Sequence, residues 1–171
     1  MSDTPLKDVP IKNAATVILV RETGDGPHVL MGQRGKAAVF MPNKFVFPGG
    51  GLDAADANVT MNGTAAPTCM ARLGNQSAPD LAGPLLAAAI REMWEETGHA
   101  IGTPSDQATT LAGTQPENWQ SFFQAGNLPD PSGLEFIFRA ITPPGRPRRF
   151  DARFFLGRAD LIQGDLDDFS R

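Results

Sequence analysis

The chain has 171 residues, a hydrophobic fraction of 41% and a formal net charge of −4, values that suit a single globular domain with its own core. The negative charge argues against a nucleic-acid partner, and no apolar run is long enough to span a bilayer. The single cysteine, Cys69, excludes an internal disulfide, and the first ten residues lack the pattern of a secretory signal. We therefore expect a cytoplasmic protein in a reducing compartment.

The first part of the chain predicts short strands joined by turns. Residues 14–20 are apolar and β-branched, which indicates a buried strand. Residues 22–27 contain glycine and proline and predict a turn, so 28–34 is expected to return as the second strand of a hairpin. Residues 44–48 predict another short strand, which ends at a proline.

Residues 57–83 differ in composition from the rest of the chain. They are rich in Asn, Gly, Thr, Pro and Ala, and only Arg72 and Asp80 carry a charge. This composition indicates loop or loosely helical material. We expect a surface insertion near the mouth of a substrate site. Replacement of Asn58–Gln76 by a short linker should leave the fold and metal binding intact and mainly change substrate preference.

The remainder of the chain predicts two helices and two strands. Residues 84–98 give the strongest helical pattern, with a proline near the start and a glycine after the end. Residues 116–126 predict a weaker helix, while 134–142 and 149–159 are aromatic and β-branched and predict strands. Helices that alternate with strands predict a mixed α/β fold.

Three glutamates crowd the end of the stronger helix. Glu92, Glu95 and Glu96 fall on one side of it, where like charges repel. Arg91 can pair with Glu95 one turn further on, but the remaining charge favours a bound cation. Oxygen ligands suit Mg²⁺ or Mn²⁺, and Mg²⁺ shares its coordination with substrate phosphates. The simpler alternative is an acidic face that is only solvated.

A second stretch, FPGGGLDAAD at 47–56, places three glycines after a strand, where the backbone can approach a ligand or metal closely. Together with REMWEETG at 91–98, it resembles the signature of the Nudix hydrolase family. The matching positions are Gly50 in the first half and Arg91, Glu92, Met93, Glu95, Glu96 and Gly98 in the second.

The sequence departs from this signature at three points. Asp56 stands where glutamate is usual, which shortens the reach of the carboxylate, and His99 stands where an apolar residue is usual. Residues 57–90 place 34 residues between Asp56 and Arg91, where the signature has seven. An insertion inside the signature is a feature of one branch of the family, which includes coenzyme A diphosphatases and many bacterial relatives.

The resemblance implies an α/β/α sandwich with a mixed sheet, in which the signature folds as loop–helix–loop. It also implies a metal-dependent hydrolase, in which water cleaves the pyrophosphate bond of a nucleoside diphosphate linked to another group with the help of Mg²⁺ or Mn²⁺. It assigns Glu92 and Glu96 as metal ligands, Glu95 as a ligand or water-mediated partner, and Gly50 as a carbonyl ligand. Arg91 completes this catalytic group and is expected to orient the glutamates.

A stretch without acids, from 136 to 150, holds several arginines. Arg148 and Arg149, with Arg153 shortly after, are candidates to bind a substrate phosphate. A solvated strand edge with a basic loop explains the same pattern equally well.

The general base in this family often lies in a late loop, and here Asp165, Asp167 and Asp168 are the candidates. The chain ends three residues after Asp168, where many relatives continue with another strand and a helix. We therefore expect residues 1–171 to form a single domain that ends early or is truncated at its C-terminus.

Two other functions stay open at this level: a Nudix-fold nucleotide-binding module without catalysis, and an unrelated α/β protein whose acidic helix faces water. If the chain is a hydrolase, its partner is a small-molecule diphosphate, with coenzyme A as one candidate. Relatives of this family are often dimers, although no long apolar stripe in the sequence points to a homodimer.

Overall fold

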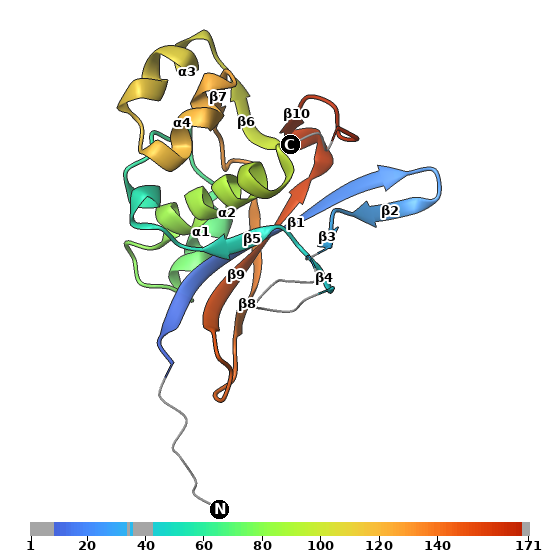
Figure 1. The fold of residues 1–171 in the computed structure, drawn as a ribbon, viewed down its shortest axis with the longest axis vertical. Coiled ribbons are helices and arrows are strands. Elements are labelled where there is room, and N and C mark those ends of the chain that lie inside the picture. Colours follow the sequence, from blue (N-terminus) through green and yellow to red (C-terminus); the bar gives the residue numbers. More distant parts are fainter. Residues whose placement is uncertain (1–8, 34, 36–42, 169–171) are drawn as a thin grey trace, which may run out of the picture.

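The fold is described by a computed structural model, which covers residues 9–33, 35 and 43–168 (Figure 1). The region examined for a secretory signal therefore lies largely outside the described residues, as does residue 34 at the end of the expected strand 28–34. In the part of the chain that is described, no helix is both long and apolar enough to cross a membrane.

The central sheet is mixed. Strand β1 (Ile11–Thr23) runs parallel to β9 (Arg149–Arg158), which pairs antiparallel with β8 (Glu135–Ile141) at one edge. On its other side β1 pairs antiparallel with β2 (Gly26–Val29) and with β5 (Gly49–Gly51). The parallel pair joins two segments from opposite ends of the chain, which brings the early glycines and the late arginines to one sheet.

Smaller strand pairs lie beside the central sheet. Strand β3 (Gly32–Gln33) pairs with β4 (Phe45–Val46), so the expected strand 28–34 is divided between β2 and β3. Strand β6 (Ala100–Pro104) pairs with β7 (Asn127–Pro129) and β10 (Ile162–Gln163). We did not predict β6, β7 or β10 from the sequence.

The helices gather on one side of strands β1 and β9 (Figure 1). They are α1 (Pro67–Gly74), α2 (Ala82–Thr97), α3 (Asp106–Leu111) and α4 (Glu117–Gln124), with 3₁₀ turns at η1 (Ala54–Ala57), η2 (Ala112–Thr114) and η3 (Ala159–Leu161). The helices expected at 84–98 and 116–126 are confirmed as α2 and α4. Gly98 ends α2 in the left-handed conformation, with φ of 74°, which a residue without Cβ adopts at low cost.

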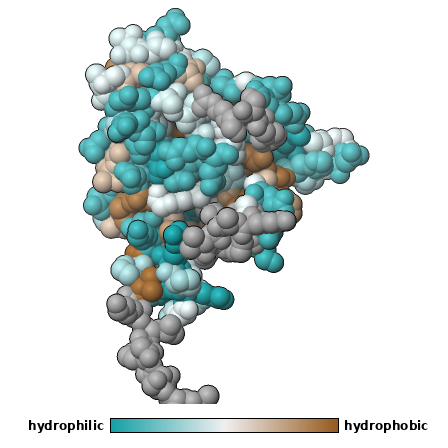
Figure 2. All heavy atoms as spheres, viewed as in Figure 1, coloured by the Kyte–Doolittle hydropathy of each residue, from teal (hydrophilic) through white to brown (hydrophobic). Residues whose placement is uncertain are grey.

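The hydrophobic core lies between the sheet and α2. Alternate residues of β1, namely Ala15, Val17 and Leu19, are buried and belong to the same core cluster as Leu86 and Ile90 of α2. This alternation fits a strand with one face on the core. The side of the molecule shown in Figure 2 is largely hydrophilic, with hydrophobic atoms in small separate patches.

The expectation that residues 57–83 form only a surface insertion is wrong. The segment contains α1, and Ala65, Cys69 and Leu73 are almost fully buried in the core cluster. The amide N–H of Phe136 on β8 donates a hydrogen bond to the Cys69 sulfur at 3.2 Å. The low charge of the segment reflects its apolar packing face as well as its loops.

Candidate active site

The glycines of β5 allow the backbone to lie against both β1 and α2. A Cβ atom at Gly49 would lie 2.5 Å from the Ala15 carbonyl oxygen, and one at Gly50 would collide with the Glu92 carboxylate. At Gly49 the obstacle is backbone, so only glycine fits there, whereas a Cβ at Gly50 would displace the Glu92 carboxylate. The Gly50 backbone thus lies beside a carboxylate of α2, while the close approach to a ligand or metal expected at residues 47–56 stays a prediction.

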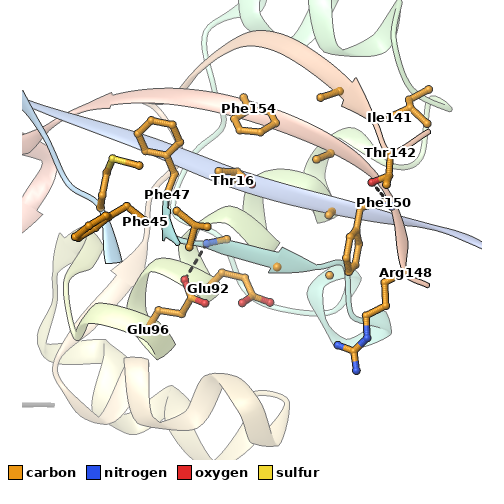
Figure 3. Close-up of a pocket in the computed structure, with 18 of the residues that line it drawn as sticks. Thr16, Phe45, Phe47, Glu92, Glu96, Ile141, Thr142, Arg148, Phe150 and Phe154 are labelled. Carbon is orange, nitrogen blue, oxygen red and sulfur yellow. Dashed lines mark hydrogen bonds between the residues drawn. The ribbon is translucent and has the colours of Figure 1, made fainter. Parts of the chain in front are cut away.

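Glu92 and Glu96 line a cavity of about 740 Å³ between β5, α2 and the open face of the sheet (Figure 3). The Gly49 amide N–H donates to the Glu96 Oε2 atom at 3.0 Å. Burial raises the pKa of Glu92; the Arg91 charge and hydrogen bond lower it, and the charges of Glu95 and Glu96 raise it again, so the net shift is upward. A second positive charge at this position would favour the ionised form of Glu92.

Arg91 joins the two halves of the motif from a buried position. Its Nη1 atom donates to Glu92 Oε1 at 2.8 Å and to Glu95 Oε2 at 3.0 Å. Its Nη2 atom donates to the Gly51 carbonyl oxygen at 2.9 Å. Arg91 does not line the cavity, so the geometry agrees with an orienting rather than a substrate-contacting residue.

Asp56 is the buried partner of Arg91. Its Oδ1 atom lies 2.9 Å from Arg91 Nε and its Oδ2 atom lies 3.1 Å from Nη2. Burial acts to lower the pKa of Arg91, but the hydrogen bond and charge of Asp56, with Glu92 and Glu95, outweigh it and raise the pKa. The shorter Asp56 side chain therefore reaches the arginine despite the 34 residues between them.

Trp119 is a residue that the sequence did not indicate for this site. It is fully buried on α4, and its indole Nε1 donates to Asp56 Oδ1 at 3.1 Å. In the sequence Trp119 is one apolar position of a weak helical pattern, with no sign of its distant partner. One general rule could have indicated a partner for Trp119: a buried tryptophan usually needs a hydrogen-bond acceptor for its indole N–H.

Glu95 lies apart from the other two glutamates. Its side chain is 41% exposed and does not line the cavity. Within the described residues, no three side chains of His, Cys, Asp or Glu form a group that could hold a metal ion. The cavity therefore offers two carboxylates, Glu92 and Glu96, which fits Mg²⁺ because this ion takes one or two carboxylates and keeps water or phosphate oxygens as its other ligands.

The three candidate arginines occupy different environments. Arg148 lines the cavity, at the end away from Glu96 in Figure 3. Arg149 donates from Nε to the Thr142 carbonyl oxygen at 3.1 Å, across the turn between β8 and β9. Arg153 is 2% exposed and donates to Asn13 Oδ1 at 2.7 Å and to Ser77 Oγ at 3.1 Å. The structure thus brings only Arg148 to the cavity.

The late aspartates do not share the cavity of Glu92 and Glu96. Asp167 Oδ1 pairs with Arg21 Nη1 at 3.0 Å and lines a separate cavity of about 180 Å³, together with His99. The backbone N–H of Asp168 donates to the Asp165 carbonyl oxygen at 3.3 Å. None of these three aspartates lines the cavity that contains Glu92 and Glu96.

Comparison with known proteins finds Nudix hydrolases among the similar proteins. No family model matches the chain. Over 156 residues the chain is 30% identical to a Caenorhabditis elegans protein described as "Putative nudix hydrolase 7", with 87% of this chain and 45% of that protein covered. The crystal structure of a NUDIX hydrolase from Alicyclobacillus acidocaldarius matches with a TM-score of 0.67 and 27% identity, covering 89% of this chain and 71% of that one.

A Nudix hydrolase from M. Smegmatis, RenU, is much more distant, with 14% identity, a TM-score of 0.38, and coverage of 86% of this chain and 61% of that one. The chain is therefore similar to Nudix hydrolases in sequence and in structure, and the Alicyclobacillus structure confirms its Nudix-type α/β fold. The chain spans about half the length of the worm relative that it matches.

Proposed function

We propose that the chain is a metal-dependent hydrolase that cleaves the pyrophosphate bond of a nucleoside diphosphate linked to another group. The observation that carries this proposal is the pair Glu92 and Glu96, which face one cavity from α2 opposite the glycines of β5. Similarity to Nudix hydrolases supports the reaction class.

Mg²⁺ or Mn²⁺ would be held by Glu92 and Glu96, with the Gly50 carbonyl as a further ligand and Glu95 as a partner through water. When bound, such an ion neutralises phosphate oxygens and lowers the pKa of bound water. The chain's own residues hold the carboxylates in place: the Gly49 amide binds Glu96, and Arg91 binds Glu92 and Glu95.

The charge distribution in the cavity favours a short diphosphate. Among the described residues that line it, Glu92, Glu96 and Arg148 are the charged ones. We propose that Arg148 contacts a substrate phosphate, because a guanidinium forms strong charge-assisted hydrogen bonds with phosphate oxygens. Arg149 and Arg153 would act indirectly, through the β8–β9 turn and the sheet. In the part of the chain that is described, Arg148 is the one lining arginine, which suits one diphosphate better than a long polyphosphate.

The group linked to the diphosphate is proposed to be planar or largely apolar. Among the described residues, four phenylalanines line the cavity: Phe45 and Phe47 lie toward one end, Phe150 lies beside Arg148, and Phe154 lies on the sheet (Figure 3). An apolar pocket with a few fixed polar groups is typical of small-molecule sites. Coenzyme A, whose diphosphate joins a nucleotide to a long uncharged arm, is a candidate of this kind.

The test is a hydrolysis screen of the purified chain with Mg²⁺ or Mn²⁺ against coenzyme A, ADP-ribose, NADH, dinucleoside polyphosphates and nucleoside triphosphates. We expect turnover of a single-diphosphate substrate. Glu96→Gln should lower the rate on the order of a hundredfold, because a metal ion supplies several kcal/mol of transition-state stabilisation.

Glu22→Gln, at an exposed position of β1, is the matched control and should leave the rate unchanged. Tight binding of these compounds without any turnover would instead establish the nucleotide-binding module. Full activity of the purified Glu96→Gln protein would overturn the assignment of this helix.

A further inference from the structure

The Asp56 carboxylate has a donor at every position where it can accept a hydrogen bond. Oδ1 accepts from Arg91 Nε and Trp119 Nε1, and Oδ2 accepts from Arg91 Nη2 and from the Asp53 backbone N–H at 2.9 Å. An ionised carboxylate offers about four acceptor sites, so these four bonds saturate it. Its 2% exposure leaves almost no room for water to replace a lost donor.

The guanidinium of Arg91 is saturated in the same way. Its five N–H groups make five bonds: two to Asp56, one to the Gly51 carbonyl oxygen, one to Glu92 and one to Glu95. A planar group with every donor engaged has one allowed orientation. Asp56 therefore fixes the orientation of Arg91. Arg91 in turn fixes the positions of the Glu92 and Glu95 oxygens that it binds.

Trp119 is the member of this network that comes from outside the two motif segments. It lies on α4, 63 residues after Asp56, and it is fully buried. Fully satisfied polar networks inside a protein fix one arrangement, whereas an unsatisfied member leaves alternatives open. Loss of the indole N–H would leave one Asp56 lone pair without a partner.

If Trp119 had only a structural role, its replacement would lower stability without changing metal affinity. Trp94 is the residue with which this alternative can be compared. Trp94 and Trp119 flank the same ring, Phe122, with edge-to-face geometry at centroid distances of 5.4 and 5.7 Å. Trp94 donates its indole N–H to the Ser121 hydroxyl at 2.9 Å, and Trp119 donates to the buried carboxylate of Asp56. The two tryptophans share their packing partner and differ in what their N–H groups hold.

We propose that Trp119 is a positioning residue for the metal site, acting through Asp56 and Arg91 on Glu92 and Glu95. This inference rests on the proposed metal-dependent function. Partners one shell removed from a metal typically change its affinity by about 10–100-fold when they are replaced. Trp119 lies three hydrogen bonds from the glutamates, two beyond Arg91, so the lower end of that range applies.

The experiment compares Trp119→Phe with Trp94→Phe in the full chain. Free Mn²⁺ is measured by electron paramagnetic resonance during titration of each protein, and thermal unfolding is followed without metal. Both variants should lose stability through the smaller ring. Only Trp119→Phe should bind Mn²⁺ more weakly, by about tenfold, while Trp94→Phe should keep the wild-type affinity.

A second variant removes the N–H without removing volume. Replacement of Trp119 by benzothienylalanine, in which sulfur takes the place of the indole N–H, should reproduce the loss of Mn²⁺ affinity with little change in packing. It also serves if Trp119→Phe does not fold. Wild-type Mn²⁺ affinity in this variant would overturn the role of Trp119 and leave the proposed function intact. A wild-type chain without measurable Mn²⁺ affinity would overturn both.

Discussion

Arg91 and Arg153 are both buried arginines with several hydrogen bonds, and they serve different parts of the molecule. Arg91 lies among Asp56, Glu92 and Glu95, and these neighbours raise its pKa against the effect of burial. Burial lowers the pKa of Arg153, which shares its one carboxylate, Asp151, with Arg139. Both arginines are buried and make several hydrogen bonds; what differs is that Arg91 binds Glu92, which lines the cavity, whereas no group that Arg153 is seen to bind lines it.

Arg153 links the segment 57–83 to the central sheet through hydrogen bonds. Its Nη2 donates to the Gln76 carbonyl oxygen at 3.2 Å and its Nε donates to Ser77 Oγ, both just after α1. Its Nη1 donates to Asn13 of β1. The Arg153 guanidinium, a candidate to bind a substrate phosphate, therefore holds the end of α1 against the sheet. The Arg91 guanidinium holds Glu92 and Glu95.

Replacement of Arg91 gives the largest expected effect. Arg91→Met leaves the buried Asp56 carboxylate without a counter-charge, which should lower the free energy of unfolding by about 3–5 kcal/mol. The folded fraction should also lose most of its Mn²⁺ affinity, because Glu92 and Glu95 lose the donor that positions them. Urea denaturation and Mn²⁺ titration measure the two effects.

Arg153→Met is the matched control for this comparison. Asp151 keeps Arg139, whose Nε and Nη2 atoms both lie 2.6 Å from its oxygens, so no carboxylate is left unpaired. The expected cost is about 1–3 kcal/mol, the loss of hydrogen bonds to buried groups. Mn²⁺ affinity should be unchanged. Equal loss of affinity in both variants would show that the two arginines do not have separate roles.

The core packing of α1 gives the next largest effect. Leu73 is fully buried, so Leu73→Ala should cost about 2–5 kcal/mol. Arg72→Ala, at the neighbouring exposed position of the same helix, should change the free energy of unfolding by less than about 0.5 kcal/mol. Similar small values for both variants in thermal or urea unfolding would restore the original prediction of a surface insertion.

Features that depend on neighbours in the sequence were predictable. The end of α2 at Gly98, the strand β1 and the close approach at Gly50 follow from periodicity, from composition and from residues that lack a side chain. The pairing of Arg91 with Glu95 follows from helical spacing alone. Each of these features places its partners within a few residues or within one motif.

Features that depend on distant contacts were not predictable. The bond from Trp119 to Asp56 spans 63 residues, and the bond from Arg153 to Ser77 spans 76. Strands such as β7 and β10 have only a few residues, so their pattern is too short to identify. Helix α3 was also not predicted, although its start carries a local signal: Ser105 caps it by accepting a hydrogen bond from the Gln107 N–H, and serine is a preferred residue there.

The smallest expected effect is the pH dependence that Asp151 contributes. Burial acts to raise the pKa of Asp151, but the hydrogen bonds and charges of Arg139 and Arg153 outweigh it and hold the pKa below its usual value. Between the folded pKa and the unfolded value, about 3.9, the unfolded chain therefore binds more protons. The contribution of Asp151 to stability is present above about pH 4 and is lost as the pH falls through the folded pKa.

Asp151→Asn removes this titration. At neutral pH the variant should be less stable than the wild type, because Arg139 and Arg153 lose their shared counter-charge. The difference in the free energy of unfolding should shrink as the pH is lowered below about 4, where the wild-type carboxyl takes up its proton. Urea denaturation of both proteins from pH 7 to pH 3 measures this difference, and a constant value across that range would show that the two arginines do not hold Asp151 in its ionised form.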